Sequence, residues 1–171
     1  AYQRSGGILL NANTSKDLTT YVVSLPSNRI GMWAWIDAER IFHPTFKEFD
    51  EERQVVIEER RQRIDNKPIG RLWEAFMGAA FAGGNPYAVP TIGNIADLET
   101  LTVDQARLFH KNYYRPDRLT GALVGRFNIG EAAAILRRNF SGAGGRSPPP
   151  LTAGDFQIQT QKGHVVVKGE G

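Results

Sequence analysis

Apolar residues recur at intervals of three and four along most of the chain, a spacing typical of amphipathic helices with one buried face. A long helix is predicted to begin near Thr45, where Thr45 and Glu48 have the spacing of a capping box. The sequence Asn66-Lys67-Pro68 interrupts the pattern, which then restarts. Helices are therefore predicted at residues 29–42, 45–64, 69–82, 95–101, 103–114 and 129–140.

Other segments have the composition of β-strands. Residues 18–25 are rich in β-branched and aromatic side chains and end at Pro26, and residues 118–127 contain the apolar run LTGALVG, which predicts a buried strand. A last short strand is predicted at 164–168. Strands at both ends and helices between them favour an α+β fold over a doubly wound parallel sheet.

The composition changes at residues 141–154, SGAGGRSPPPLTAG, which are rich in Gly, Ser and Pro as linkers are. We therefore predict one domain at 1–140, a linker at 141–160, and the first strand of a second domain at 161–171. The chain does not begin with Met, and Gly6-Gly7 indicates an internal loop, so we expect that an upstream portion exists.

Large apolar side chains are candidates for the core of the predicted domain. In the helix predicted at 69–82, the expected core residues are Leu72, Trp73, Phe76 and Phe81. The three tryptophans, Trp33, Trp35 and Trp73, could line a cleft, but core packing is expected for at least two of them.

The overall composition is that of a globular protein, with 41% hydrophobic and 23% charged residues and a formal net charge of +3. Arg60, Arg61 and Arg63 form a basic cluster, but acidic residues surround it, so a solvated helix face is expected rather than a nucleic-acid site. The chain has no cysteine, which excludes disulfides and Cys-based zinc sites.

The segment 49–64, FDEERQVVIEERRQRI, places two acidic residues where apolar ones are expected. At about 100° per residue, Glu52 and Glu59 share an arc with Val55 and Val56. Two helical turns, roughly 10 Å, separate the two carboxylates, so they cannot both bind one small ion directly. An ion pair between Glu59 and Arg63, four residues apart, would explain Glu59 without any metal.

Several motifs, taken in order, resemble one known family. They are Asn11-Ala12-Asn13-Thr14-Ser15-Lys16-Asp17 with Thr20-Tyr21, Pro44-Thr45-Phe46, Glu52-Arg53 with Val55-Val56 and Glu59, Pro86-Tyr87, Gly93, and Tyr113-Tyr114-Arg115-Pro116. Over residues 6–140 the chain resembles the pitrilysin/insulinase zinc metallopeptidases, which include the mitochondrial processing peptidases. The resemblance implies an α/β-roll in which helices pack on one face of a mostly antiparallel sheet, here truncated at its N-terminus.

The resemblance also implies roles for single residues. In the family, an H-x-x-E-H helix and a later glutamate hold zinc. Matching the pattern E-R-x-x-V-x-x-E assigns the metal ligand to Glu59, and Glu52 becomes the catalytic-site candidate that supports the site without binding metal.

The same resemblance makes Asn11, Ala12 and Thr14 the expected peptide contacts. In the family, this segment borders the cleft, and its edge strand offers backbone groups to an extended substrate. The alternative is a plain polar loop that caps a strand.

The chain departs from the family pattern in one decisive respect, because it contains no H-x-x-E-H sequence. Its three histidines, His43, His110 and His164, have no partner at the required spacing, and each is expected to be a core or surface residue. The family's histidine pair would lie upstream of Gly6-Gly7, so the chain alone is expected to be inactive and to bind Zn²⁺ weakly at most.

The resemblance implies that the parent protein is a zinc endopeptidase that cleaves peptides or unfolded segments with a metal-activated water. Its expected partners are a peptide substrate and a second homologous domain or subunit, with no nucleic acid and no membrane span. A bacterial periplasm or cytoplasm is favoured over the mitochondrial matrix. The alternatives are a non-catalytic family member that binds peptides beside an active partner, and a structural α+β domain outside the family.

Overall fold

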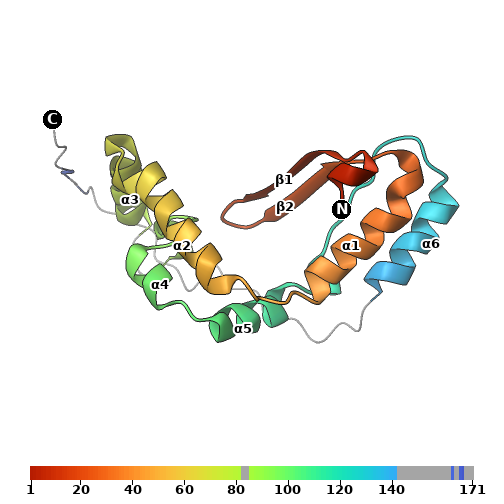
Figure 1. Cartoon of the computed structure of the whole chain (residues 1–171). Helices are drawn as coiled ribbons and strands as arrows, with labels where there is room; N and C mark the ends of the chain where they lie inside the picture. Colours follow the sequence, from red (N-terminus) through yellow and green to blue (C-terminus); the bar gives the residue numbers. More distant parts are fainter. Residues whose placement is uncertain (82–84, 142–162, 164–165, 168–171) are drawn as a thin grey trace. The chain divides into compact units, whose positions relative to one another are not determined.

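The computed structural model describes residues 1–81, 85–141, 163 and 166–167 (Figure 1). The chain divides into two compact units. The described part of the first unit comprises Ala1–Thr14, Leu18–Phe46 and residues 104–141. That of the second comprises Ser15–Asp17 and residues 47–81, 85–103, 163 and 166–167. Most of the predicted linker and of the strand predicted at 164–168 lies outside the described residues, and Val166 and Val167 are not in a strand.

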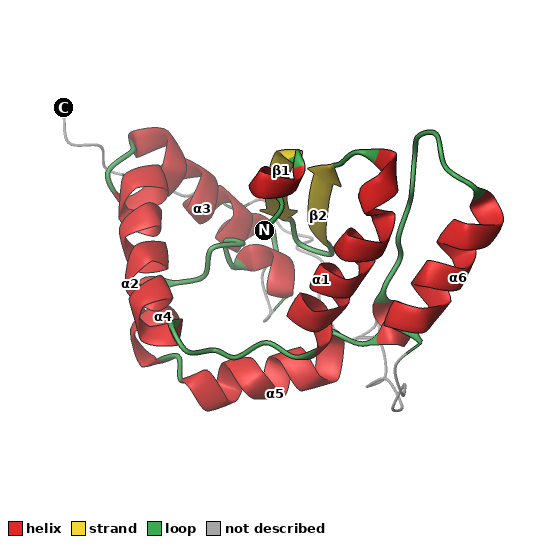
Figure 2. Cartoon of the chain, turned by 45° about the vertical axis from the view of Figure 1, so that its right-hand side comes forward, coloured by secondary structure: helices red, strands yellow, loops and turns green. Residues whose placement is uncertain are grey.

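The first unit combines a β-hairpin with helices (Figure 2). The elements are β1 (Ile8–Thr14), β2 (Thr19–Ser24), α1 (Ile30–Phe42), α5 (Val103–Tyr113) and α6 (Ile129–Phe140). Helix α1 packs against α6, where Phe140 meets the rings of Trp33 and Phe42 at centroid distances of 5.9 and 6.1 Å. The buried residues of α1 include Ala34, Ala38 and Ile41, whose spacing of four and three puts them on one helical face.

Strands β1 and β2 pair antiparallel, with Ile8 opposite Ser24 and Asn11 opposite Val22. This register leaves one extra residue on β1 between the two pairs, which is a β-bulge. Leu9 lies in the bulge with φ of +55°, a conformation that is strained for a residue with a Cβ. Every residue of β1 is exposed.

The second unit consists of short helices. They are α2 (Phe49–Arg60), a π-helical turn (Arg61–Asp65), α3 (Pro68–Ala80), a 3-10 turn (Pro86–Ala88) and α4 (Ile95–Thr100). A Cβ on Gly70 would lie 2.7 Å from the Ile64 Cα, so α3 can approach the π turn only because residue 70 is glycine. The hairpin turn Ser15–Asp17 also belongs to this unit, and there the Tyr87 hydroxyl donates to the Asp17 carboxylate at 2.6 Å.

The predicted α+β class and the predicted helices are confirmed, and so is the strand at 18–25, observed as β2. The sheet within the described residues has two strands, β1 and β2. No helix in the described part of the chain combines the length and apolarity needed to cross a membrane.

Two predicted local features are wrong. The run at 118–127 forms no strand, and Val124 within it is 97% exposed, because no neighbouring strand among the described residues offers backbone groups to pair with. The capping box of Thr45 and Glu48 is also absent, since α2 begins only at Phe49 and the Glu48 side chain makes no capping bond.

The prediction that the large apolar residues of α3 lie in the core is wrong. Leu72, Trp73 and Phe76 are 49, 62 and 55% exposed, and no residue of α3 is buried. Phe81 is half-buried, and its ring is tilted against that of Tyr87 at a centroid distance of 5.6 Å. Among the tryptophans, Trp35 and Trp73 are exposed and Trp33 is half-buried, so the expectation that at least two lie in the core is also wrong. Helical periodicity identified an apolar face, but nothing in the described residues covers it.

Candidate functional site

Helix α2 is fixed in the second unit by two arginines rather than by an apolar stripe. At about 100° per residue, Arg53, Ile57 and Arg60 lie within about 60° of one another. Ile57 and Arg60 are buried, at 3 and 5% exposure, and Arg53 is half-buried. The Arg53 guanidinium donates to the carbonyl oxygen of Leu101 at 2.7 Å, which connects α2 to the end of α4.

Arg60 is the centre of this anchored face. Its guanidinium donates to both oxygens of Glu74 on α3 at 3.0 Å and to the Gly93 carbonyl oxygen at 2.8 Å. It also lies 3.3 Å from the carboxylate of Asp65, at the end of the π turn. Arg60 therefore connects α2, the π turn, α3 and the loop before α4.

The expectation that Arg60 belongs to a solvated face is therefore wrong, whereas Arg61 and Arg63 are exposed as expected. Sequence reasoning took the charge of Arg60 as a sign of exposure. Its position, three residues after Ile57 and seven after Arg53, was the signal that could have placed it on the buried face.

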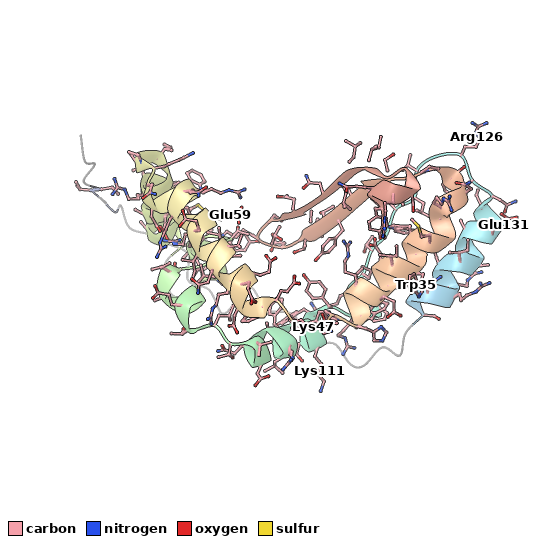
Figure 3. The ribbon with its side chains drawn as sticks, in the orientation of Figure 1. Trp35, Lys47, Glu59, Lys111, Arg126 and Glu131 are labelled. Atoms are coloured by element: carbon pink, nitrogen blue, oxygen red, sulfur yellow. The ribbon has the colours of Figure 1, made fainter. Side chains whose placement is uncertain are left out.

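Glu59 and Glu52 lie on a flank of α2, roughly 110° from the anchored face. Glu59 is labelled on α2 in Figure 3. Its side chain is 39% exposed and pairs with Arg63 at 2.7 Å, the ion pair that the sequence offered as an alternative to a metal ligand. Glu52 is exposed. The predicted apolar arc around them is wrong in part, because Val55 is 60% exposed and Val56 is only half-buried.

The predicted peptide contacts lie on β1, in the first unit. Ala12 pairs with Tyr21 of β2 and Thr14 with Thr19, so residues 11–14 form a strand, and the loop of the alternative is limited to Ser15–Asp17. The Ala12 N–H donates to the side-chain oxygen of Asn11 at 2.9 Å. A peptide carbonyl that paired with this N–H would replace the bond to Asn11.

The described histidines have structural roles. An imidazole nitrogen of His110 lies 2.6 Å from the carbonyl oxygen of Ile41, and the ring stacks on Tyr114. His43 ends α1 and lies 3.6 Å from Glu39. His164 falls outside the described residues.

The described residues do not form a metal site by themselves. Among them, no group of three or more His, Cys, Asp and Glu side chains is placed to hold a metal ion. Glu59 offers a carboxylate, an oxygen donor that zinc accepts, but one carboxylate is not a complete ligand set.

Comparisons with known proteins point to one class, the zinc proteases. Zinc protease PqqE of Helicobacter pylori is 34% identical over 81% of this chain and 31% of its own length. Probable zinc protease PqqL of Escherichia coli is 33% identical over 77% of this chain and 14% of its own length. The rat mitochondrial-processing peptidase subunit alpha is 30% identical over 72% of this chain and 24% of its own length.

Solved structures agree with these relatives. The crystal structure of a protease from Helicobacter pylori matches 94% of this chain and 38% of that chain, with a TM-score of 0.82 and 30% identity. The first half of the periplasmic protease PqqL from Escherichia coli matches with a TM-score of 0.70 and 26% identity, over 84% of this chain and 31% of that chain.

A family model described as the Peptidase M16 inactive domain matches residues 100–171. With the relatives above, this match confirms the resemblance of the chain to the pitrilysin/insulinase-type family of zinc metallopeptidases. The chain spans about a third of the length of the first curated relatives it matches.

Proposed function

We propose that this chain is part of a zinc-dependent endopeptidase that cleaves peptides or unfolded segments, and that Glu59 is one ligand of its metal. The names of the relatives, zinc proteases, support the reaction class. Zinc supplies such a peptidase with a Lewis acid and an activated water. The remaining ligands and the general base are not among the described residues, so the chain alone is inactive in this proposal.

The observation that carries the proposal is that helix α2 is firmly anchored whereas the Glu59 side chain on it is not. Helix α2 is held by the buried Arg60, whereas the ion-pair partner of Glu59 among the described residues is Arg63, whose side chain is 71% exposed. An exposed ion pair of this kind is worth about 0–1 kcal/mol. The Glu59 carboxylate can therefore exchange Arg63 for a metal ion at small cost, and Glu52 on the same flank supports it.

The second part of the proposal is that β1 binds the substrate as an added strand. Asn11, Ala12 and Thr14 lie on a strand whose residues are all exposed. An extended peptide that pairs with such a strand gains main-chain hydrogen bonds. The partners in this proposal are the peptide substrate and a second homologous domain or subunit. For the compartment, a bacterial periplasm or cytoplasm is favoured over the mitochondrial matrix.

A second candidate function is a non-catalytic family member that binds peptides as the partner of an active protease. One observation favours it, since the family model that matches residues 100–171 is described as an inactive domain. The two functions differ in whether the intact protein hydrolyses peptides.

The test uses the full-length protein encoded by the gene and quenched fluorescent peptides, with and without a zinc chelator. Glu59→Gln should lower kcat/KM by more than about 100-fold, beyond the 10–100-fold typical of groups that only support a ligand, and Glu52→Gln should fall within that range. The control is Glu58→Gln, because Glu58 is an exposed neighbour that contacts Arg61 and Gln62. Peptide binding without hydrolysis in zinc-loaded protein would establish the second function instead.

A further inference from the structure

Tyr21 of β2 is held from two sides in the first unit. The Arg40 guanidinium on α1 lies over its ring at 4.8 Å from the centroid. Its hydroxyl lies 3.3 Å from the hydroxyl of Tyr114, which follows α5. Tyr21 also stands opposite Ala12 in the strand register, so a single residue connects the middle of the hairpin to both helices.

The support from α1 is itself fixed. Arg40 pairs with Asp37 at 3.0 Å, and Asp37 is only 6% exposed. The Tyr2 hydroxyl, on a side chain that is also buried, donates to the same Asp37 carboxylate at 2.5 Å. The buried Asp37 carboxylate, which accepts from both Tyr2 and Arg40, therefore holds the Arg40 guanidinium in place over the Tyr21 ring.

The support from α5 is fixed as well. The His110 ring stacks on Tyr114 at a centroid distance of 4.9 Å. The position of the His110 ring is set by its hydrogen bond to the Ile41 carbonyl oxygen and by an edge contact with Phe46. Burial, followed by the hydrogen bond with Tyr114, raises the pKa of Tyr21 to about 12, so the Tyr21 hydroxyl keeps its proton over the physiological range.

Strand β1 has few supports of its own. All its residues are exposed, so the strand is positioned by its pairing with β2 and by its ends. At one end, Gly7 donates its N–H to the Tyr2 carbonyl oxygen at 2.9 Å. Between its ends, at Ala12, β1 is supported by Tyr21, the residue that lies opposite Ala12 on β2.

We propose that Tyr21 is a positioning residue for peptide binding, because it fixes the backbone of β1 at Ala12 in the geometry that an added strand requires. This inference rests on the proposed peptide-binding role of β1. Tyr21 acts through the strand and does not touch the peptide. Removing it should weaken binding of the ground state and of the transition state alike, which raises KM and leaves kcat unchanged.

The experiment compares Tyr21→Ala and Tyr21→Phe in the full-length protein, using a peptide that the wild type cleaves. Tyr21→Ala loses both contacts and should raise KM about tenfold with kcat unchanged, which corresponds to about 1.4 kcal/mol of binding. Tyr21→Phe keeps the ring under Arg40 and should restore most of the binding. If the full-length protein binds peptides without cleaving them, the dissociation constant of a peptide that the wild type binds replaces KM.

The matched control is Tyr113→Ala. Tyr113 is 41% exposed, close to the 39% of Tyr21, but its ring contacts Phe109 and Arg118 instead of the hairpin. Its removal should leave KM unchanged. Hydrogen exchange of the amides at residues 11–14 is the second readout, and it should accelerate in Tyr21→Ala but not in Tyr113→Ala.

The outcomes separate this inference from the function on which it rests. A wild-type protein that neither cleaves nor binds peptides would refute the proposed function. Wild-type binding together with unchanged KM and unchanged exchange in Tyr21→Ala would refute the positioning role alone. If Tyr21→Ala does not fold, Tyr21→Leu replaces it, because leucine fills part of the volume of the ring but loses the contacts with both Arg40 and Tyr114. A raised KM in Tyr21→Leu would support the positioning role, and an unchanged KM would contradict it.

Discussion

Each unit is held by a polar network, and the two networks differ in chemistry. In the second unit the centre is a permanent charge, Arg60, whose side chain is 6% exposed and contacts Glu74, Asp65 and a backbone carbonyl. In the first unit the centre is a neutral phenol, Tyr21, which is 39% exposed and held by a guanidinium and a second phenol. Removing the buried charge of Arg60 should therefore lower the free energy of unfolding more than removing the half-exposed hydroxyl of Tyr21. Of the two groups, the phenol is the one that loses its proton at alkaline pH.

The largest expected effect is that of Arg60→Met. It leaves the carboxylates of Glu74 and Asp65 without their shared cation and should lower the free energy of unfolding by about 2–3 kcal/mol. This is below the roughly 3–5 kcal/mol of a fully buried pair, because both carboxylates are partly exposed. Urea denaturation measures it, and the exposed Arg61→Met should change stability by no more than about 0.5 kcal/mol. Equal effects in the two variants would show that the Arg60 network does not hold the unit.

Gly70→Ala tests the same unit through its backbone. An added Cβ would lie 2.8 Å from the Arg63 carbonyl oxygen as well as 2.7 Å from the Ile64 Cα, and backbone atoms cannot move aside cheaply. The expected loss in the free energy of unfolding is about 1–3 kcal/mol. Gly78, on the same helix, is the control, since its Cβ would meet nothing within 4 Å. Gly78→Ala should be neutral or stabilise by up to about 1 kcal/mol, and the same result at both positions would contradict the close approach of α3 to the π turn.

Alkaline pH should act on the network of the first unit. The pKa of Tyr21 is raised from its ordinary value of 10.0 to about 12, mainly by burial and then by the hydrogen bond with Tyr114. The unfolded chain therefore loses this proton at lower pH than the folded chain. The resulting stability is complete below pH 10 and decreases as the pH rises toward 12. Urea denaturation of wild type and Tyr21→Phe should give curves that converge between these pH values, and parallel curves would contradict the raised pKa.

The smallest expected effect is that of Arg63→Gln. It removes the partner of Glu59 at the surface and should cost about 0.3–0.5 kcal/mol, the value of an exposed pair on a helix. Urea denaturation measures this loss in the free energy of unfolding, and the loss should be much smaller than that of Arg60→Met. A loss above about 1 kcal/mol would mean that Glu59 is held structurally, and would remove the basis for an exchangeable carboxylate.

The sequence predicted what depends on local pattern and missed what depends on distant partners. The helix at 129–140 was predicted with the bounds that α6 has, because its apolar spacing and its stop signals are local. The strand at 118–127 needs a neighbouring strand, and periodicity cannot show whether one is present. Arg60 was misplaced because its burial depends on Glu74, fourteen residues away.

The candidate site was predicted unevenly for the same reason. The ion pair of Glu59 with Arg63 follows from helical spacing and is confirmed. The metal role of Glu59, the supporting role of Glu52 and the peptide contacts of β1 came from the family resemblance and stay predictions. The contacts of Tyr21 join segments 19 and 93 residues apart along the chain, and no local pattern indicates them.

The most direct measurement is the zinc affinity of the full-length protein, determined by chelator competition for wild type, Glu59→Gln and Glu58→Gln. We expect one zinc ion per chain, an affinity more than about 100-fold weaker in Glu59→Gln, beyond the 10–100-fold typical of supporting groups, and an affinity within about twofold of wild type in Glu58→Gln. Wild-type zinc affinity in Glu59→Gln would show that Glu59 is not a metal ligand and that its pairing with Arg63 is its whole role.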